Sequence, residues 1–449
     1  MNTNQTDLTD LTNEKLPIKT LLPLGLQHVL AMYAGAIAVP VIVGAAIGLT
    51  PQQIAYLVAA DLFTCGIATL IQAFGFGKYI GVKLPVIMGC SFVSVAPMIT
   101  IGKASGLPVI YGSVICAGIF VLLISSFFGK LLKFFPSLVT GTVIMIVGLS
   151  LIPVALNDAA GGYGPTHGNP KNLILAGIVI IFICILNRYF KGFMQAASVL
   201  LGLVFGTIVA SFMGMVNLSA VSSAGWFRVV TPFYFGLPKF ELGPIFTMCL
   251  ISLILMIEAV GVFIGVSNIC GKKVENSEIV SGLRGEGLAQ ILGGVFNSFP
   301  YTTFSQNVGL VALSGIKSRY VTVCSGLILI CLGIIPKVAA LATIIPHAVL
   351  GGATLAMFGM VSVSGIRILS SVDFSKTGNM LTIALAVGIG LSSKVSPGLF
   401  DQLPYALKFV LEDGIVAGSL VAIFGNIFFN YKEIMASENN VSIPNNHTL

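Results

Sequence analysis

The chain has 449 residues, of which 56% are hydrophobic and only 9% are charged, and its mean hydropathy is +1.00. A soluble domain carries about 25% charged residues, so this composition excludes an ordinary soluble enzyme and indicates an integral membrane protein. The net charge of +7 does not indicate a nucleic-acid partner, because the cytoplasmic loops of membrane proteins carry excess Lys and Arg.

Apolar segments of about 20 residues, the length of helix that crosses a bilayer, recur from Leu21 to Asn430. We predict an all-α membrane protein with fourteen segments and both termini cytoplasmic, an orientation that places most of the 23 Lys and Arg residues on the inner side. The predicted segments are centred near Ala34, Ala60, Ser91, Phe120, Met145, Ile180, Leu203, Met256, Ile291, Asn307, Leu327, Ala356, Ala384 and Ser419.

Polar stretches divide the chain into predicted regions. The tails, 1–20 and 431–449, are expected to be cytoplasmic, and they flank two sets of seven spans at 21–216 and 240–430. Three longer loops join spans: 157–172 and the stretch around Trp226 are expected to be external, and 270–287 internal. A soluble domain that could hydrolyse ATP is missing from this plan, and so is a GxxxxGK[ST] loop, so uphill transport would need an ion gradient.

Two segments combine apolar residues with helix-breaking residues. The third contains Pro85, Gly89 and Pro97, and the tenth contains Pro300 and Gly309 beside a dense polar patch. Proline removes a helical donor, so each segment is predicted to be a broken helix, unless the prolines only shape packing. Each is the third of its set of seven, which favours a transporter built from inverted repeats with its binding site at the breaks.

Three acidic residues fall within or beside apolar segments. Glu258 lies inside one, so it faces a cavity, forms a pair or is protonated; this suits proton-coupled transport, with a neutral structural role as the alternative. Glu286 lies near a predicted segment end, where it either caps a helix N-terminus or serves the site. Asp61 is predicted to form hydrogen bonds between helices.

Histidine and cysteine add few further hypotheses. His28, in the first span, could bond across helices, orient a carboxylate, titrate or only pack. The eight cysteines lack CxxC or metal-ligand spacing, so neither a disulfide framework nor a metal site is expected.

The stretch "QNVGLVALSG", Gln306 to Gly315, resembles the signature of the nucleobase-ascorbate transporters, also called the nucleobase cation symporter 2 family. The resemblance extends to "GLQHVLAMYAGAIAVPVIVG", "LPVIMGCSFVSVAPM", "EAVG" and "IPHAVLGGATLAMFGMV", and covers essentially the whole chain. Ser314 stands where Thr is usual in the signature, which keeps the hydroxyl group.

The resemblance implies an architecture. Members of the family have fourteen spans in two inverted seven-helix repeats, with short strands in the broken third and tenth segments. Spans of both repeats form a core domain and a gate domain, and the gate domain also forms a homodimer. The resemblance also implies a location in the plasma membrane.

The resemblance implies a purine site as well. Its substrate-binding positions are Glu258, Gln306, Ser305, Phe92 and Ser91, with the Ser305 backbone and the Phe92 ring contacting the base and Ser91 tuning the choice among purines. Its supporting or proton-coupling positions are His28, Glu286 and Asn307.

The function that these positions imply is import of an oxidised purine, xanthine and/or uric acid, by proton symport with alternating access and without a cofactor. One departure is Val262, where some xanthine carriers have Asp. The alternatives are a uracil or other nucleobase permease, which Gln306 disfavours because uracil carriers typically have Glu there, a passive facilitator, and a membrane enzyme.

Overall fold

The computed structural model describes residues 11–128, 134–162, 164, 166–404, 408 and 411–439 of the chain. The outer parts of both predicted tails, 1–10 and 440–449, lie outside the described residues. The chain forms two compact units. Unit 1 comprises Met1–Ser125 and Ala155–Thr354, and unit 2 comprises Ser126–Val154 and Leu355–Leu449.

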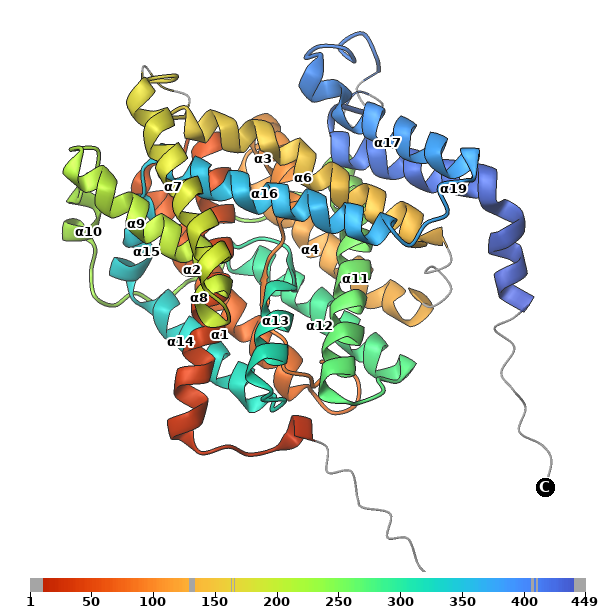
Figure 1. Ribbon diagram of the computed structural model, residues 1–449, viewed down its shortest axis with the longest axis horizontal. Coiled ribbons are helices and arrows are strands. Elements are labelled where there is room, and N and C mark those ends of the chain that lie inside the picture. The colour runs from red at the N-terminus through yellow and green to blue at the C-terminus, as the bar shows by residue number, and fades with distance from the viewer. Residues whose placement is uncertain are drawn as a thin grey trace, which may run out of the picture. The chain divides into compact units, whose positions relative to one another are not determined.

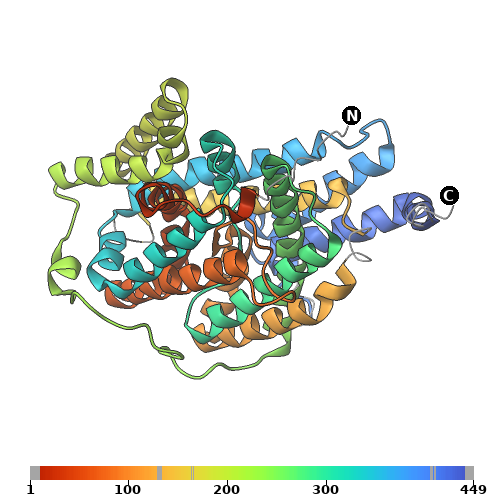
Figure 2. The same cartoon turned by 90° about the horizontal axis from the view of Figure 1, so that it is seen from below.

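Unit 1 contains most of the helices and both strands. Figures 1 and 2 show the helices from two directions. Its helices in the first half of the chain are η1 (Leu11–Asn13), α1 (Ile18–Ala46), α2 (Pro51–Phe74), η2 (Phe92–Ser94), α3 (Val95–Ser105), α4 (Leu107–Ile124), α7 (Pro170–Tyr189), α8 (Phe193–Ala196), α9 (Ser198–Phe212) and α10 (Ser219–Ser223). Those of the second half are α11 (Leu242–Cys270), α12 (Asn276–Val295), α13 (Gln306–Ser314), α14 (Tyr320–Ile334) and α15 (Pro336–Thr343). The strands are β1 (Met88–Cys90) and β2 (Tyr301–Thr303).

Unit 2 contains η3 (Ser125–Phe127) in part, α17 (Thr377–Val395) and α19 (Gly414–Asn439). The boundary between the units falls inside α6 (Ser137–Ala159) and α16 (His347–Leu369). Helices α17 and α19 run side by side (Figure 1), and a Cβ on Gly414 would meet the Gly390 carbonyl oxygen, so their backbones approach closely.

Nine helices of the described residues are long and apolar enough to cross a membrane, or ten if α14 and α15, which meet at 80°, form one broken span. The protein is therefore mainly helical with multiple apolar spans. The remaining predicted centres fall on or beside shorter or more polar elements: η2 and α3, α9, α12 and α13. Fourteen crossings stay a prediction.

Small residues bring the central helices of unit 1 together. A Cβ on Gly66 of α2 would lie 2.5 Å from the Gly326 carbonyl oxygen of α14, and one on Gly118 of α4 would lie 2.6 Å from the Gly287 carbonyl oxygen of α12. Such close approach is how membrane helices gain contact, because lipid provides little hydrophobic drive for helix association. The pairs α2–α14 and α4–α12 form the centre of unit 1.

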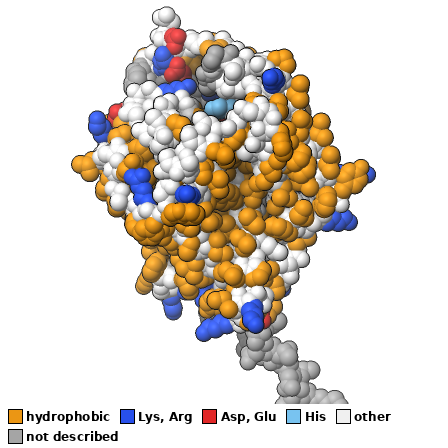
Figure 3. Space-filling view, turned by 90° about the vertical axis from the view of Figure 1, so that its left-hand side faces the viewer, with side chains coloured by type: hydrophobic (Ala, Val, Ile, Leu, Met, Phe, Trp, Pro, Cys, Tyr) orange, Lys and Arg blue, Asp and Glu red, His pale blue; other side chains and the backbone are white. Residues whose placement is uncertain are grey.

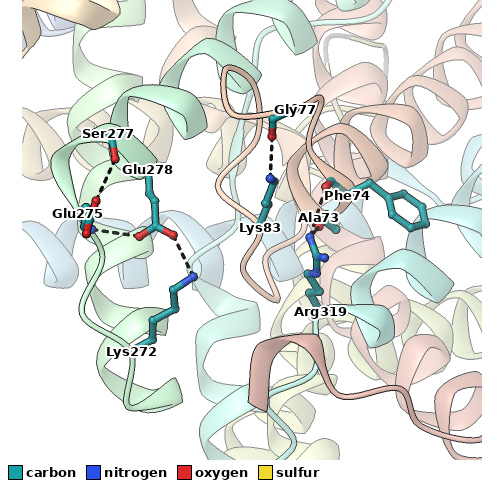
Figure 4. Close-up of polar contacts among 9 residues, drawn as sticks. All are labelled: Ala73, Phe74, Gly77, Lys83, Lys272, Glu275, Ser277, Glu278 and Arg319. Carbon is teal, nitrogen blue, oxygen red and sulfur yellow. Dashed lines mark hydrogen bonds and ion pairs between the residues drawn. The ribbon is translucent and has the colours of Figure 1, made fainter. Parts of the chain in front are cut away.

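The surface of unit 1 is hydrophobic on one side and carries polar and charged contacts at one end. Figure 3 shows a broad hydrophobic surface on the side where α7 and α9 lie, which carry exposed Ile181 and Ile208. At the C-terminal end of α2, polar contacts join the loops instead (Figure 4): Arg319 donates to the Ala73 carbonyl oxygen at 2.9 Å, and Lys272 pairs with Glu278 at 2.9 Å. An apolar side and a charged end suit a protein surrounded by lipid.

The predicted internal loop 270–287 is largely helical, which corrects its boundary. Helix α12 begins at Asn276, because Glu275 and Glu278 form a capping box that satisfies its first backbone N–H groups. Glu286 therefore lies near the middle of α12, and the alternative that it caps a helix N-terminus is wrong.

Candidate functional site

The two predicted breaks meet as a small antiparallel sheet. Strand β1 pairs with β2, with Met88 opposite Thr303 and Cys90 opposite Tyr301. Two more main-chain hydrogen bonds extend the ladder, from Ser91 N to the Pro300 carbonyl oxygen (3.0 Å) and from Phe304 N to the Ile87 carbonyl oxygen (2.9 Å). Short strands in the third and tenth segments are thus confirmed, and the residues that follow each strand are fixed relative to the other strand.

The residues that follow β1 are Ser91 and Phe92, and both are buried. The Ser91 hydroxyl accepts from Val93 N at 3.1 Å and caps η2, so its position is set by the helix start. The Phe304 ring, which follows β2, lies against Gly35 of α1 and Gly89 of β1, and Phe92 also approaches Gly35. The Phe92 and Phe304 rings therefore lie on the side of the β1–β2 ladder that faces α1.

The residues that follow Phe304 begin α13. Ser305 and Gln306 are exposed at this helix start, whereas Asn307 is buried. The Asn307 amide nitrogen lies 3.0 Å from the His28 carbonyl oxygen and 3.1 Å from His28 Nδ1. In this orientation the imidazole accepts at Nδ1 and carries its proton on Nε2. His28 and Asn307 thus join α1 to α13, while Gln306 stays free for a ligand.

Glu258 lies on α11, which packs against η2, β2 and α13. Its side chain is only partly buried, and its carboxyl group has no hydrogen-bond or ion-pair partner among the described residues. One turn further along, a Cβ on Gly261 would meet no atom within 4 Å. An acceptor inside an apolar helix, next to open space and without a protein partner, is suited to bind a solute.

The Glu286 side chain on α12 holds β2 through a hydrogen bond from Thr303. It is 1% exposed, and its Oε1 accepts from Thr303 Oγ1 at 2.6 Å, with Gln72 Nε2 at 3.5 Å. Its Oε2 is buried without a partner. Glu258 and Glu286 lie close enough to interact electrostatically, so the ionisation of one influences the other.

Asp61 bonds to both strands, whereas the sequence predicted hydrogen bonds from this residue to another helix. Its Oδ1 accepts from Ser298 Oγ at 2.7 Å, from Tyr301 OH at 2.9 Å and from the Cys90 thiol. All four residues are buried. One carboxyl oxygen of α2 therefore holds the last residue of β1, Cys90, and the first residue of β2, Tyr301.

Replacing Asp61 with Ala is expected to lower the thermal stability of the protein by several degrees. Three buried donors would lose the carboxyl oxygen that they share, and each group left unsatisfied costs about 1–3 kcal/mol. Tyr301 OH still reaches the main-chain oxygen of residue 61 at 3.0 Å, and Ser298 Oγ lies 2.7 Å from Tyr301 OH, so the Cys90 thiol is affected most. The measurement is the midpoint of loss of monodisperse protein after heating in detergent, read by size-exclusion chromatography. Asp61→Asn, which keeps an oxygen acceptor, should lose less, and a wild-type midpoint for Asp61→Ala would contradict this role.

The structure places all eight predicted site residues in unit 1. Helix α11, which carries Glu258, contacts both η2, which carries Phe92, and α13, which begins after Ser305 with Gln306. Glu286 bonds to Thr303 of β2, and Asn307 bonds to His28 of α1. Sequence reasoning missed Gln72, Thr303 and Phe304. Gln72 carried a usable signal, because a polar amide in the apolar stretch "TLIQAF" requires a partner.

A multi-span membrane protein whose two broken segments meet beside an unpartnered carboxyl group has the construction of a transporter. Residues 19–399 match the family model described as "Permease family". The chain belongs to this family, and it is a transporter and not an enzyme.

Several curated proteins and solved structures are similar to the chain. It is 50% identical to the nucleobase transporter PlUacP of Paenibacillus larvae (95% of this chain, 98% of that protein) and 47% identical to the uric acid permease PucJ of Bacillus subtilis (95% and 96%). It is also 50% identical to a xanthine permease of Bacillus subtilis (91% and 93%). The transmembrane domain of the cyanobacterial bicarbonate transporter BicA shares the fold at a TM-score of 0.59 and 16% identity (93% of this chain, 100% of that chain). Murine Slc26a9 does so at 0.60 and 14% (92% and 69%).

Proposed function

We propose that this chain is a secondary active transporter that imports an oxidised purine, xanthine and/or uric acid, by proton symport. The observation that carries the proposal is the partner-free carboxyl group of Glu258 beside the elements that bear Phe92, Ser305 and Gln306. The names of the relatives, uric acid permease and xanthine permease, support this substrate class.

The proposed recognition follows from the shape and edges of these purines. Xanthine and uric acid are planar, with ring N–H donors and carbonyl acceptors, so Glu258 accepts from ring N–H groups while the Gln306 amide supplies one donor and one acceptor. Phe92 stacks on the base, and the Ser305 backbone at the start of α13 contacts its edge. A site that satisfies these edges rejects analogues that leave its polar groups unpaired.

Proton coupling uses the same carboxyl groups. Glu258 binds a proton with the purine on the outer side, and both leave on the inner side after the core domain moves relative to the gate domain. Glu286 and the pair His28–Asn307 influence this proton through the hydrogen bonds behind the site. Protons are the coupling ion in this proposal, and no cofactor takes part.

The proposed architecture has fourteen spans in two inverted repeats, with both termini cytoplasmic, in the plasma membrane as a homodimer. The two central pairs of unit 1 support the repeat. Helices α2 and α14 are the second and eleventh predicted segments, and α4 and α12 are the fourth and ninth. In two repeats of seven segments, the second segment corresponds to the ninth and the fourth to the eleventh. The two pairs are therefore equivalent under the repeat. The charged end in Figure 4 is then the cytoplasmic end.

The test is uptake of labelled xanthine and uric acid by purified protein in lipid vesicles. An inward proton gradient is expected to drive accumulation above the outside concentration, and collapsing the gradient should leave only equilibration. Accumulation that follows a sodium gradient instead would overturn the proton assignment. Equilibration without accumulation under either gradient would indicate a passive facilitator.

Replacing Gln306 with Glu is expected to weaken competition by xanthine and uric acid about tenfold or more, because the carboxylate cannot donate the hydrogen bond that the amide gives. Competition by uracil should strengthen relative to xanthine. The measurement is inhibition of labelled xanthine uptake by xanthine, uric acid, guanine, hypoxanthine and uracil. The control is Gln402→Glu, the same change at an exposed turn residue of unit 2; an unchanged profile for Gln306→Glu would refute the role of this amide.

A further inference from the structure

Unit 1 has a cavity that shares no lining residue with the proposed purine site. Its volume is about 280 Å³, and its walls include Gln52, Tyr56, Phe227, Arg228, Pro336 and Ala340. We refer to it as the Arg228 cavity. It lies at the first two turns of α2, whereas the charged contacts of Figure 4 lie at the other end of that helix.

The segment between α9 and α11 forms one wall of the Arg228 cavity and runs around the outside of unit 1 (Figure 2). Three hydrogen bonds hold it in place: Arg228 N donates to the Ile334 carbonyl oxygen at 3.0 Å, Thr231 N to Tyr56 OH at 3.0 Å, and Phe233 N to the Val295 carbonyl oxygen at 2.9 Å. Another wall is formed by α15, which leaves α14 at 80°. The cavity therefore has anchored walls.

The Arg228 cavity combines one cationic side chain, Arg228, with mainly apolar lining residues. The Arg228 guanidinium lies 4.8 Å from the ring centroid of Tyr56 and 4.9 Å from that of Tyr234, which restricts its orientation. The described part of the chain provides no hydrogen-bond acceptor for its side-chain N–H groups. The planar guanidinium, with free donors, matches carbonyl or anionic oxygens, and the apolar lining residues Ala55, Pro336 and Ala340 can contact the face of a ring.

We propose that the Arg228 cavity is a second binding site, outside the transport site, for a planar anionic heterocycle rich in carbonyl acceptors, of which the urate monoanion is the example. The choice of urate rests on the proposed function, whereas the donors, the apolar lining and the volume do not. The cavity lies at the end that the distribution of Lys and Arg predicts to be external, where an imported purine arrives.

The chain has a built-in reporter for this site. Trp226 is its single tryptophan; it is 75% exposed, lies two residues from Arg228, and has Lys337 Nζ 4.2 Å from its ring centroid. Titrating the purified full-length protein in detergent with uric acid is expected to quench Trp226 fluorescence in a saturable way. Free tryptophan titrated in parallel corrects for light absorbed by uric acid.

Four variants separate this site from the transport site. Arg228→Gln is expected to raise the half-saturating concentration of uric acid about tenfold or more, and Gln52→Ala several-fold. Gln306→Ala, which changes the transport site, should quench as the wild type does. Lys337→Gln removes a positive charge beside Trp226 outside the cavity wall, and it too should keep the saturable quench.

Three results would overturn the inference: no saturable quench in the wild type, a quench that survives Arg228→Gln but is lost in Gln306→Ala, or equal displacement of uric acid by inorganic phosphate. The last would mean a general anion site. Because binding is read without transport, failure of purine uptake leaves this test intact, and failure of the quench leaves the proposed function intact.

Discussion

Glu258→Gln is expected to abolish accumulation of labelled xanthine and uric acid in vesicles under an inward proton gradient. The amide cannot take up and release the proton, and it presents one acceptor oxygen in place of two. The loaded carboxyl group is neutral in this mechanism, and a hydrogen bond between neutral groups contributes about 0.5–1.5 kcal/mol, so purine binding should also weaken about 2- to 10-fold. The measurements are uptake against time and equilibrium binding of labelled xanthine to the purified variant.

The control for Glu258→Gln is Glu241→Gln, the same substitution at the N-cap position of the same helix, where the carboxyl group accepts from Ser105 Oγ at 2.9 Å. This variant should accumulate purine as the wild type does. Normal uptake by Glu258→Gln would remove this residue from both recognition and coupling. Weak binding together with normal proton-driven accumulation at high purine would restrict it to recognition.

Gly89→Ala is expected to prevent assembly of the site. A Cβ at position 89 would lie 1.9 Å from Cε2 of Phe304, inside the ring's own volume, so the ring or β1 must move. Phe304 is confined by Gly35 on α1 and is followed by Ser305 and Gln306, so its displacement would move both of these predicted ligands. Overpacking of a buried site costs about 1–3 kcal/mol or more. Both the thermal midpoint and purine uptake should fall sharply.

Gly309→Ala is the matched control, because a Cβ at that position of α13 would meet no atom within 4 Å. It should keep the thermal midpoint of the wild type. If Gly89→Ala had the same midpoint and the same uptake as Gly309→Ala, the close packing of Phe304 on β1 would be refuted. A normal midpoint with lost uptake would place the effect in the position of Ser305 and Gln306 alone.

The sequence predicted the membrane class and the two breaks well, because hydropathy and proline act locally. It did not predict the start of α12, since "KKVENSEIVSGLRGEG" reads as a polar loop and the capping box of Glu275 and Glu278 spans only four residues inside it. That error left Glu286 at an apparent helix end, although its partner is Thr303 on β2.

The contacts that assemble the site join distant parts of the chain. Asp61 was predicted to hydrogen-bond, yet Tyr301 lies 240 residues away, and no local pattern identifies such a partner. The pairing of His28 with Asn307 spans 279 residues for the same reason. Resemblance to a family supplied Gln306, Ser305 and Phe92, whereas hydropathy alone singled out Glu258 as a charge inside an apolar helix.

The ladder between β1 and β2 has an evolutionary consequence. Its bonds, including those from Ser91 N and Phe304 N, join main-chain atoms, so the residues that follow each strand take part in the pairing without their side chains. The side chains that follow each strand can therefore mutate while the frame that presents them persists. In the proposed site, a few substitutions after the strands can therefore change the ligand while the pairing of the strands, and with it the folded protein, is kept.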